Sequence, residues 1–378
     1  MRRSQSPRAS ARSAGKSKEF LDRAHEWAHV DDTIDMRPGE VLETEKLEPY
    51  LRAHLPKATG PMTVRQFGNG HANLTYSIAF GESEYVLRRP PHGPLPKGGH
   101  DMAREYRVLS RLWRAFSLAP RAFVLCTDRE VLGADFVVME RKHGIVIRRE
   151  LPQAIATDPA ACRRLGEAFV DTLAAFHRVD YERAGIVDLG HPDGYLERQL
   201  DGWAARWEAA RTPEFPDATA AIAGLRATRP ESGPPALVHN DFKLENAVVD
   251  AADPTRVVAI LDWDMCTVGD PLADLGNVLS LWTDPGQAPT MGNSTMPTGA
   301  PGFPTRQELI ARYAAATGRD CSRASWYHAF NVFRYAAISQ QIYARYVREQ
   351  TADERFKDFG FFTAALVARA GAMVAAGV

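Results

Sequence analysis

Three polar residues near the middle of the chain have the types and spacing that transfer of a phosphoryl group requires. Asp241 and Asn246 stand five positions apart, and Asp262 directly follows the apolar run 257–261. The reaction needs a group that orients or deprotonates the acceptor hydroxyl, and oxygen ligands that hold magnesium on the phosphates. Asp241 can fill the first role, and Asn246 with Asp262 the second. A lone His-x-Asp is more often a surface turn, but here three residue types and two spacings agree.

Other polar residues around Asp241 are candidates for supporting roles. Lys243 can neutralise charge on the transferring phosphoryl group, although a solvated lysine is the plain alternative. His239 is grouped with the catalytic candidates, although we expect it to buttress the loop through hydrogen bonds. Asp264 can reach a second magnesium or face the solvent. Asp274 is expected to be a structural acceptor that ties down the catalytic segment.

The segment 67–73 supplies a candidate phosphate-binding loop. Gly68, Asn69, Gly70 and Asn73 lie between two expected strands, and glycines let backbone N–H groups approach phosphate oxygens closely. Because the segment precedes a strand rather than a helix, it does not fit the dinucleotide-binding fingerprint of a Rossmann fold. An ordinary hairpin turn is the alternative interpretation.

Phosphoryl transfer from a nucleotide also needs a cation on the α- and β-phosphates, anchored by a carboxylate from a helix. Arg88 ends a strand-like run, and Glu105 on the helix that follows is its natural partner. Arg89 competes with Arg88, because alternation along a strand sends only one of the two to the phosphate side. Met139, in another apolar strand, is a further candidate for nucleotide contact, although such a run is also typical of core.

These candidates need a scaffold of two parts. Residues 20–141 show the pattern of a small nucleotide-binding lobe, with an antiparallel sheet and one prominent helix. Its expected strands are 62–67, 73–80, 85–88 and 136–140, and its expected helices are a short one near 47–54 and a longer one over 101–116. Residues 142–378 are expected to form a larger, mainly helical lobe for catalysis and acceptor binding. Its expected helices lie around 165–176 and over 195–208, 306–317, 326–350 and 353–376, and the segment 285–304 is expected to be a mobile loop or lid.

The composition of the 378-residue chain argues against several classes of function. Its 46 basic and 47 acidic residues give a net charge of −1, with no general attraction to nucleic acid or an anionic membrane. No apolar run approaches the ~20 residues of a membrane span. Four scattered cysteines indicate neither a zinc site nor a disulfide framework, which favours a reducing, cytoplasmic setting. Residues 1–19 are expected to form a disordered tail, with a transit peptide as the alternative.

Longer stretches of the sequence resemble the aminoglycoside phosphotransferase family of kinase-like enzymes. They are His-Asn-Asp-Phe-Lys-Leu-Glu-Asn over 239–246, Ile-Leu-Asp-Trp-Asp over 260–264 and Val-Gly-Asp-Pro-Leu-Ala-Asp-Leu over 268–275. The first also has the Asp-to-Asn spacing of the protein-kinase catalytic loop. The resemblance covers about residues 45–350. In detail the chain is most similar to the branch that stands alone in bacteria or is fused to acyl-CoA dehydrogenases in animals.

This resemblance implies a two-lobed, protein-kinase-like fold of the α+β class, with ATP as phosphoryl donor and Mg²⁺ as cofactor. By position, Asp241 would be the catalytic base, and Asn246 and Asp262 would be the magnesium ligands. Arg88 and Glu105 would form the pair that holds the phosphates, called the clamp below. Two departures from the family pattern bear on function. Asn240 stands where the resistance enzymes usually have Gly, which puts an antibiotic substrate in doubt. Arg88 stands where typical kinases have Lys, which puts the clamp geometry in doubt.

We therefore predict an ATP- and Mg²⁺-dependent kinase for a small-molecule hydroxyl, with a hydroxyacyl thioester among the candidate acceptors. The acceptor wall is expected near Arg334, Tyr335 and Arg345. The stretch 332–348 contains no acid, so it suits an anionic or amphipathic acceptor better than a polycation. An aminoglycoside or a choline- or homoserine-like alcohol is the alternative acceptor. A nucleotide-binding pseudokinase or regulatory module is an alternative of another class, and the sequence leaves the oligomeric state open.

Overall fold

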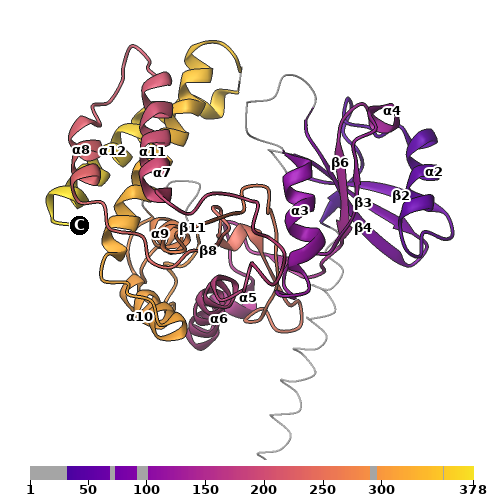
Figure 1. The fold of residues 1–378 in the computed structure, drawn as a ribbon, viewed down its shortest axis with the longest axis horizontal. Helices are drawn as coiled ribbons and strands as arrows, with labels where there is room; N and C mark the ends of the chain where they lie inside the picture. Colours follow the sequence, from indigo (N-terminus) through magenta and orange to yellow (C-terminus); the bar gives the residue numbers. More distant parts are fainter. Residues whose placement is uncertain (1–31, 69–72, 92–100, 290–295, 352) are drawn as a thin grey trace, which may run out of the picture.

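The chain folds into two lobes, a small lobe built on a sheet and a larger helical lobe (Figure 1). The computed structural model describes residues 32–68, 73–91, 101–289, 296–351 and 353–378. The expected tail 1–19 lies outside these residues, as do Asn69 and Gly70 of the candidate phosphate loop. The predicted α+β architecture, with an antiparallel sheet in the first lobe and mainly helices in the second, is confirmed.

The small lobe is built on a six-stranded sheet in which every pairing is antiparallel. In spatial order the strands are β1 (Thr33–Ile34), β2 (Met62–Phe67), β3 (Leu74–Phe80), β4 (Ser83–Arg89), β6 (Phe136–Glu140) and β5 (Ala122–Cys126). The turn between β3 and β4 holds Gly81 at φ +59°, a left-handed conformation that glycine adopts without steric cost. Alternate side chains of β3, namely Tyr76, Ile78 and Phe80, are buried in a core that belongs to this lobe.

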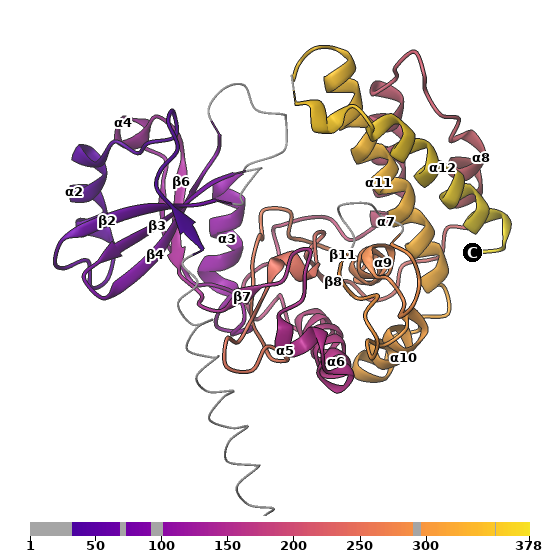
Figure 2. The ribbon, with the colours of Figure 1, turned by 180° about the vertical axis from the view of Figure 1, so that it is seen from behind.

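Three helices accompany this sheet, and two of them correspond to the expected helices near 47–54 and over 101–116. The three are α2 (Thr44–His54), α3 (Met102–Leu112) and the short α4 (Arg129–Leu132). Asp101 caps α3 by accepting a hydrogen bond from the backbone N–H of Arg104 at 2.9 Å. Because α3 packs on β5 and β6, it lies on the side of the sheet that faces the helical lobe (Figures 1 and 2). This position makes α3 the element of the small lobe that is best placed to support a site between the lobes.

The chain passes into the helical lobe between β6 and β7 (Ile145–Val146). The helices of this lobe are α5 (Gln153–Ala156), α6 (Pro159–His177), α7 (Tyr195–Ala209), α8 (Thr219–Ala227), α9 (Leu272–Leu281), α10 (Arg306–Thr317), α11 (Ala324–Val347) and α12 (Phe359–Ala375). The expected long helices are confirmed to within a few residues. The last one is interrupted near its start, where a separate turn over Glu354–Phe356 precedes α12.

Two small antiparallel sheets at the centre of the helical lobe position the candidate site. β8 (Ala236–Val238) pairs with β11 (Thr267–Gly269), and β9 (Ala247–Val249) lies between β10 (Val257–Ile260) and β7. The loop 239–246 runs from β8 to β9, and the loop 261–266 runs from β10 to β11. Since each loop joins the same two sheets, the strand pairings bring the loops side by side.

Part of the segment 285–304 packs into the helical lobe instead of standing free as a lid. Met296 and Phe303 are buried, and the Met296 sulfur lies 3.3 Å from the backbone nitrogen of Leu244 in the catalytic segment. The Thr298 hydroxyl accepts a hydrogen bond from the Thr283 N–H at 2.8 Å and donates one to the Thr283 carbonyl at 2.9 Å. The expectation of a mobile lid is corrected for the described residues after 295, because their apolar side chains are used in packing.

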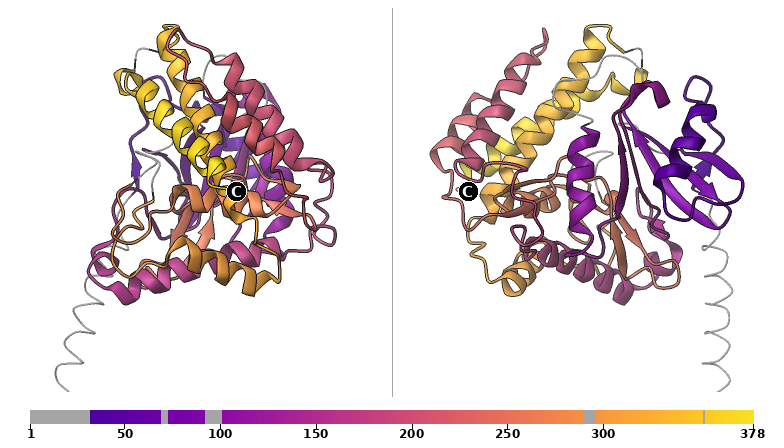
Figure 3. Two further views of the ribbon diagram at one scale, coloured as in Figure 1. Left: turned by 90° about the vertical axis from the view of Figure 1, so that its left-hand side faces the viewer. Right: turned by 45° about the vertical axis from the view of Figure 1, so that its right-hand side comes forward.

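Among the described residues, one helical stretch, Glu354–Ala375, is long and apolar enough to cross a membrane by length and composition alone. Its α12 part packs along α11, where the Thr363 hydroxyl donates to Ser339 at 2.8 Å. α12 lies on the outer side of the helical lobe, away from the small lobe (Figure 3). A helix that packs on a neighbouring helix can have the same length and apolar composition as a membrane-spanning helix. The absence of a membrane span therefore stays a prediction.

Candidate active site

The loop 239–246 presents Asp241 with two polar neighbours from the same loop. Its carboxylate accepts a hydrogen bond from Asn246 Nδ2 at 2.9 Å and lies 3.0 Å from Lys243 Nζ. The Asp241 side chain keeps 22% of its surface exposed, enough to meet an acceptor hydroxyl. Burial lowers the pKa of Lys243, but the charge of Asp241 raises it above its usual value. The site therefore combines an exposed carboxylate with a protonated amine.

The start of this loop is held by Asp274, which is fully buried on α9. Asp274 Oδ2 accepts from the backbone N–H of His239 at 2.6 Å, and Oδ1 accepts from that of Asn240 at 2.7 Å. On the other side of Asp274, the His177 Nε2 lies 3.2 Å from Oδ2, and the His177 Nδ1 lies 2.7 Å from the Tyr313 hydroxyl. This is the structural role expected for Asp274, with α6 and α10 supplying its support.

His239 and Asn240 shape the loop without exposed reactive groups of their own. His239 is fully buried, with Nδ1 accepting from the Asp241 N–H at 3.2 Å and Nε2 placed 3.0 Å from the Leu261 carbonyl. These contacts fit the expected buttressing role rather than contact with reactants. Asn240 has a left-handed backbone, φ +68°, which asparagine tolerates better than most residues other than glycine. The departure from glycine at this position is therefore compatible with the loop.

Two residues expected to face the acceptor instead support this loop. Arg334 on α11 is buried and donates from Nη2 to the carbonyl of Asn240 at 2.7 Å. Tyr335 donates to Asn277 at 2.9 Å, and Asn277 donates to the carbonyl of Phe242 at 3.1 Å. The expectation that Arg334 binds an anionic acceptor is corrected, because its burial and its hydrogen bond fix the catalytic loop.

The remaining arginines of α11 and its C-cap differ in availability. Arg348 donates to the carbonyls of Ala209 and Arg211 at 3.1 and 3.0 Å, which ties the end of α11 to the end of α7. Arg345 is exposed, and its side chain makes no hydrogen bond or ion pair with another residue that the structure describes. Of the expected acceptor-side arginines, Arg345 alone keeps a free guanidinium within the described part of the chain.

Asp262 lies on the second loop and connects the helical lobe to the small lobe. Its backbone is left-handed, φ +68°, and the N–H of the preceding Leu261 donates to the carbonyl of Asn246 at 2.7 Å. The two candidate magnesium ligands therefore stand on adjacent, hydrogen-bonded loops. Arg88 on β4 donates from Nη2 to the Asp262 carboxylate at 2.9 Å and from Nη1 to Glu105 on α3. The structure thus joins the predicted clamp to a predicted metal ligand.

The choice between Arg88 and Arg89 is settled by strand alternation. Arg88 points to the inter-lobe side, whereas Arg89 donates to the carbonyl of Leu132 at 3.2 Å. Burial lowers the pKa of Arg88, but the charges of Glu105 and Asp262 raise it above its usual value. A charged guanidinium with five donors can hold these carboxylates and still present edges to phosphate oxygens.

The second loop concentrates negative charge beside Asn246. Burial, together with the charge of Asp262, raises the pKa of Asp264 to about 6. Burial also acts to raise the pKa of Asp262, but the charge and hydrogen bond of Arg88 lower it below its usual value. Within the described part of the chain, no three His, Cys, Asp or Glu residues form a metal cage. Closely spaced oxygen donors without a full cage fit Mg²⁺, which takes several ligands from phosphates and water.

The structure describes part of the expected nucleotide-binding set. The Gly68 carbonyl accepts a hydrogen bond from Arg37. Asn73 is buried and donates to Asp264 at 3.5 Å, which places the start of β3 against the second loop. Met139 is buried in a core that continues from α3 into the helical lobe. Contact of these three residues with a nucleotide stays a prediction.

Two residues that position the site gave no clear signal in the sequence. Arg104 on α3 donates to the carbonyl of Cys266 at 3.0 Å and to that of Leu189 at 2.8 Å, which fixes α3 to the helical lobe. Tyr195, at the start of α7, donates to the Asn240 side chain at 3.0 Å. Their partners are backbone carbonyls or distant loops, which periodicity and spacing do not reveal. The position of Arg104 beside Glu105 is the one available hint.

Comparison with known proteins agrees with this geometry. Residues 63–327 match the phosphotransferase enzyme family. The chain belongs to this family. The phosphotransferase is 30% identical over 331 residues to acyl-CoA dehydrogenase family member 11 of Rattus norvegicus, which covers 85% of this chain and 42% of the rat protein. It is 32% identical over 338 residues to the Gallus gallus protein of the same name, covering 86% of this chain and 43% of that protein.

A plant relative and several solved structures extend this picture. The phosphotransferase is 30% identical over 331 residues to a protein of Arabidopsis thaliana, described as probable acyl-CoA dehydrogenase IBR3, covering 81% of this chain and 39% of that protein. The chain thus spans about two fifths of the length of these relatives. A Ralstonia eutropha JMP134 structure, described in provisional terms as an aminoglycoside phosphotransferase, has a TM-score of 0.77 and 28% identity, covering 89% of this chain and 99% of that one.

A more distant structure shows the fold alone. Aminoglycoside phosphotransferase APH(4)-Ia, solved with AMP-PNP and hygromycin B, has a TM-score of 0.55 and 16% identity, covering 86% of this chain and 99% of that one. The two-lobed fold and the expected family resemblance are therefore confirmed. As a member of this family, the chain belongs with phosphotransferase enzymes.

Proposed function

We propose that this phosphotransferase uses ATP and Mg²⁺ to phosphorylate a hydroxyl group of an acyl thioester. The observation that carries the phosphoryl-transfer part is the chain of contacts across the lobes. Glu105 holds Arg88, Arg88 reaches Asp262, and Asp262 stands beside the loop that presents Asp241. This arrangement brings together a phosphate-binding cation, oxygen ligands for a metal and an exposed carboxylate.

In this proposal each residue has a separate task. The Asp241 carboxylate accepts a hydrogen bond from the acceptor hydroxyl and takes its proton as the oxygen attacks the γ-phosphorus. The bond from that phosphorus to the bridging oxygen breaks, and ADP leaves with the electron pair. Lys243 offsets charge on the transferring group, and Arg88 holds phosphate oxygens through its guanidinium edges.

The donor set of this chain suits Mg²⁺ as the cofactor. Asn246 uses its amide nitrogen on Asp241, which leaves the amide oxygen for a metal, and Asp262 keeps 33% of its side-chain surface exposed. Asp264 would serve a second ion. Bound Mg²⁺ would offset the negative charge of the phosphates.

The acyl thioester is favoured by the relatives and by the charge around the site. The relatives are named as acyl-CoA dehydrogenases, and this chain matches about two fifths of the length of each. Asp284 is the one acid between Thr283 and Thr305 in the sequence, and it is paired with Arg306 at 2.9 Å. A polycationic aminoglycoside would need a pocket with many free carboxylates, and this segment does not supply one.

An assay of ADP release with matched acceptors tests the proposal. Hydroxyacyl-CoA thioesters of different chain length and hydroxyl position should support turnover, whereas the same acyl-CoA thioesters without a hydroxyl should not. Kanamycin-like compounds should be poor substrates. Aminoglycoside phosphorylation with a kcat/KM of ~10⁴ M⁻¹s⁻¹ or above, the common enzyme range, would overturn the acceptor assignment. AMP-PNP binding with no ADP release on any hydroxylated acceptor would favour the pseudokinase alternative instead.

A further inference from the structure

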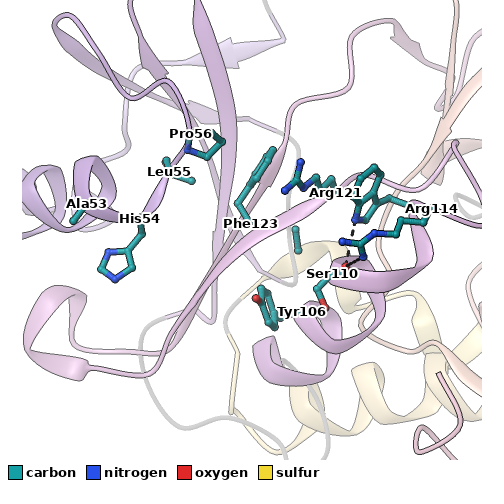
Figure 4. A pocket seen from close by; sticks show the side chains of 11 residues that line it. Ala53, His54, Leu55, Pro56, Tyr106, Ser110, Arg114, Arg121 and Phe123 are labelled. Carbon is teal, nitrogen blue, oxygen red and sulfur yellow. Dashed lines mark hydrogen bonds between the residues drawn. The ribbon is translucent and has the colours of Figure 1, made fainter. Parts of the chain in front are cut away.

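A hollow on the small lobe lies away from the residues assigned to phosphoryl transfer. It has a volume of about 450 Å³ and is bounded by the end of α2, the outer side of α3 and the start of β5. Figure 4 shows Leu55 and Pro56 on one side, Tyr106 and Ser110 of α3 on the other, and Phe123 of β5 between them. A volume of this size is within the range of small-molecule sites.

One end of this hollow, which we call the α3 pocket, carries two stacked arginines. The Arg114 guanidinium lies 4.7 Å from the centroid of the Trp113 ring, and the Arg121 guanidinium lies 4.8 Å from the same ring. Arg121 also lies 4.9 Å from the Phe123 ring. Stacking holds a guanidinium by its faces and leaves its N–H groups directed outward along its edges, where they match a carboxylate or a phosphate.

These two cations have no counter-charge in the α3 pocket. None of its lining residues is Asp or Glu. The Arg121 guanidinium makes no hydrogen bond or ion pair with another residue that the structure describes, and Arg114 donates to the carbonyl of Ser110 at 3.0 Å. Glu140 contacts only the backbone of Arg121, whose N–H donates to its carboxylate at 3.1 Å. The same carboxylate pairs with Lys142 at 3.0 Å. Two like charges beside one ring attract an anion to this end of the α3 pocket.

The α3 pocket is connected to the active site by one rigid element. Tyr106 and Ser110 line it from the same helix that carries Glu105, the partner of Arg88, and Arg104, the anchor to the helical lobe. A ligand that fills the space between α2 and α3 therefore acts on the helix that sets the position of the Arg88 guanidinium.

We propose that the α3 pocket binds a small anion with a flat aromatic ring, and that this ligand changes the affinity of the enzyme for ATP through α3. The ring lies against Tyr106 and Phe123, and the anionic group meets the edges of Arg114 and Arg121. This site is separate from the nucleotide and acceptor sites, and its occupancy does not depend on which acceptor the enzyme uses.

Calorimetric titration with 2-naphthoate, with 2-naphthamide as the uncharged control, tests binding. The proposal expects 2-naphthoate to bind the full chain in the presence of saturating Mg·AMP-PNP and 2-naphthamide to bind at least tenfold more weakly. Arg121→Gln and Arg114→Gln should each weaken the naphthoate by tenfold or more while leaving the melting temperature unchanged. Arg129→Gln removes an exposed small-lobe arginine outside the pocket and should leave binding unchanged. No naphthoate binding, competition by AMP-PNP for one site, or equal affinity in the Arg121→Gln variant would overturn the site.

A second titration tests the connection through α3. The dissociation constant of Mg·AMP-PNP should change about fivefold or more when 2-naphthoate is saturating, the lower end of typical coupling between sites. The same change should be lost in Arg121→Gln, whose own Mg·AMP-PNP affinity should stay normal. Naphthoate binding with no change in nucleotide affinity would overturn the connection. Both readouts are binding constants, so failure of the proposed acceptor chemistry would leave them unaffected.

Discussion

Two fully buried carboxylates, Asp274 and Glu105, support the two halves of the active site in different ways. Asp274 uses both oxygens on backbone N–H groups of the catalytic loop, and its helix belongs to the same lobe as that loop. Glu105 uses one oxygen on Arg88, while its other oxygen has no hydrogen-bond partner in the described part of the chain. Through Arg88 it reaches Asp262 in the opposite lobe. The contacts of Asp274 therefore stay within one lobe, whereas those of Glu105 connect the two lobes.

This difference separates a fixed half from an adjustable half. The base and its loop are held by contacts within the helical lobe, so their geometry is set when that lobe folds. The metal ligand Asp262 and the clamp Arg88 depend on how closely the two lobes approach each other, and movements of this kind accompany substrate binding in many enzymes. We therefore expect mutations in the first network to cost stability and mutations in the second to cost nucleotide binding.

The largest effect is expected from substitution of Asp241, the proposed catalytic base. Asp241→Asn should lower kcat by ~10²–10⁴-fold, because the amide cannot take the proton from the acceptor hydroxyl. Its affinity for Mg·AMP-PNP and its melting temperature should stay close to those of the wild type, since neither network is broken. Steady-state kinetics on a verified acceptor, with calorimetry for the nucleotide, provide the measurement. Near wild-type turnover would show that another group acts as base.

Asp262→Ala should lose activity to at least a comparable degree, but for a different reason. The substitution removes a proposed metal ligand and the partner of Arg88, so the dissociation constant of Mg·AMP-PNP should rise together with the loss of turnover. Because Asp262 is left-handed, Asp262→Asn serves as the matched control for backbone effects, since asparagine tolerates that conformation. If both variants bound Mg·AMP-PNP like the wild type, the metal assignment would fail.

The sequence predicted the local parts of this site better than its connections. The spacing of Asp241, Asn246 and Asp262 correctly indicated that these groups lie close together, whereas alternation along β4 left Arg88 and Arg89 as alternatives. Local patterns suffice there, because each residue is placed by its own strand or loop. Arg334 is an example of a connection that the sequence did not reveal. Its charge and position suggested that it binds the acceptor, but in the folded chain it donates a hydrogen bond to the Asn240 carbonyl.

The same limit explains the errors in the loop predictions. The segment 285–304 has a composition that is typical of mobile loops, yet Met296 and Phe303 are buried against the helical lobe. Whether such side chains are buried depends on the surface that the folded helical lobe presents to them. The spacing of residues within the segment carries no information about that surface. Arg104 was overlooked for a related reason, since it binds backbone carbonyls that look alike in any sequence.

A smaller effect, on stability rather than turnover, is expected from the closed network. Asp274→Asn places an amide N–H₂ opposite one of two backbone N–H donors, so one buried donor loses its acceptor. The free energy of unfolding should fall by roughly 2–3 kcal/mol, the scale of a lost buried hydrogen bond to a charged group. Asp201→Asn removes an exposed carboxylate paired with Arg226 and should cost less than about 0.5 kcal/mol. An Asp274→Asn variant that unfolds like the wild type in denaturant would contradict the fixed role of Asp274.

The smallest effect comes from His328 on α11, whose Nε2 atom is buried and has no hydrogen-bond partner among the residues that the structure describes. Burial, together with the charges of Arg306 and Arg369, lowers the pKa of His328 from 6.5 to about 3. Because the folded-state pKa lies below the unfolded value, the neutral form stabilises the fold fully above pH 6.5. That contribution is lost as the pH falls from 6.5 toward 3, since unfolding then takes up a proton. The loss should reach about 1 kcal/mol near pH 5.5.

Replacing His328 with glutamine should therefore flatten the pH dependence of unfolding without changing turnover at pH 7.5. Denaturant unfolding between pH 7.5 and 5.0 measures this, with replacement of the exposed His191 by glutamine as the matched control. His177, whose pKa burial also lowers, stays in both variants and contributes equally. If His328→Gln lost stability on acidification as steeply as the wild type, protons would be taken up elsewhere. Unlike Asp274, His328 would then have a buried ring nitrogen that has no measurable consequence for folding.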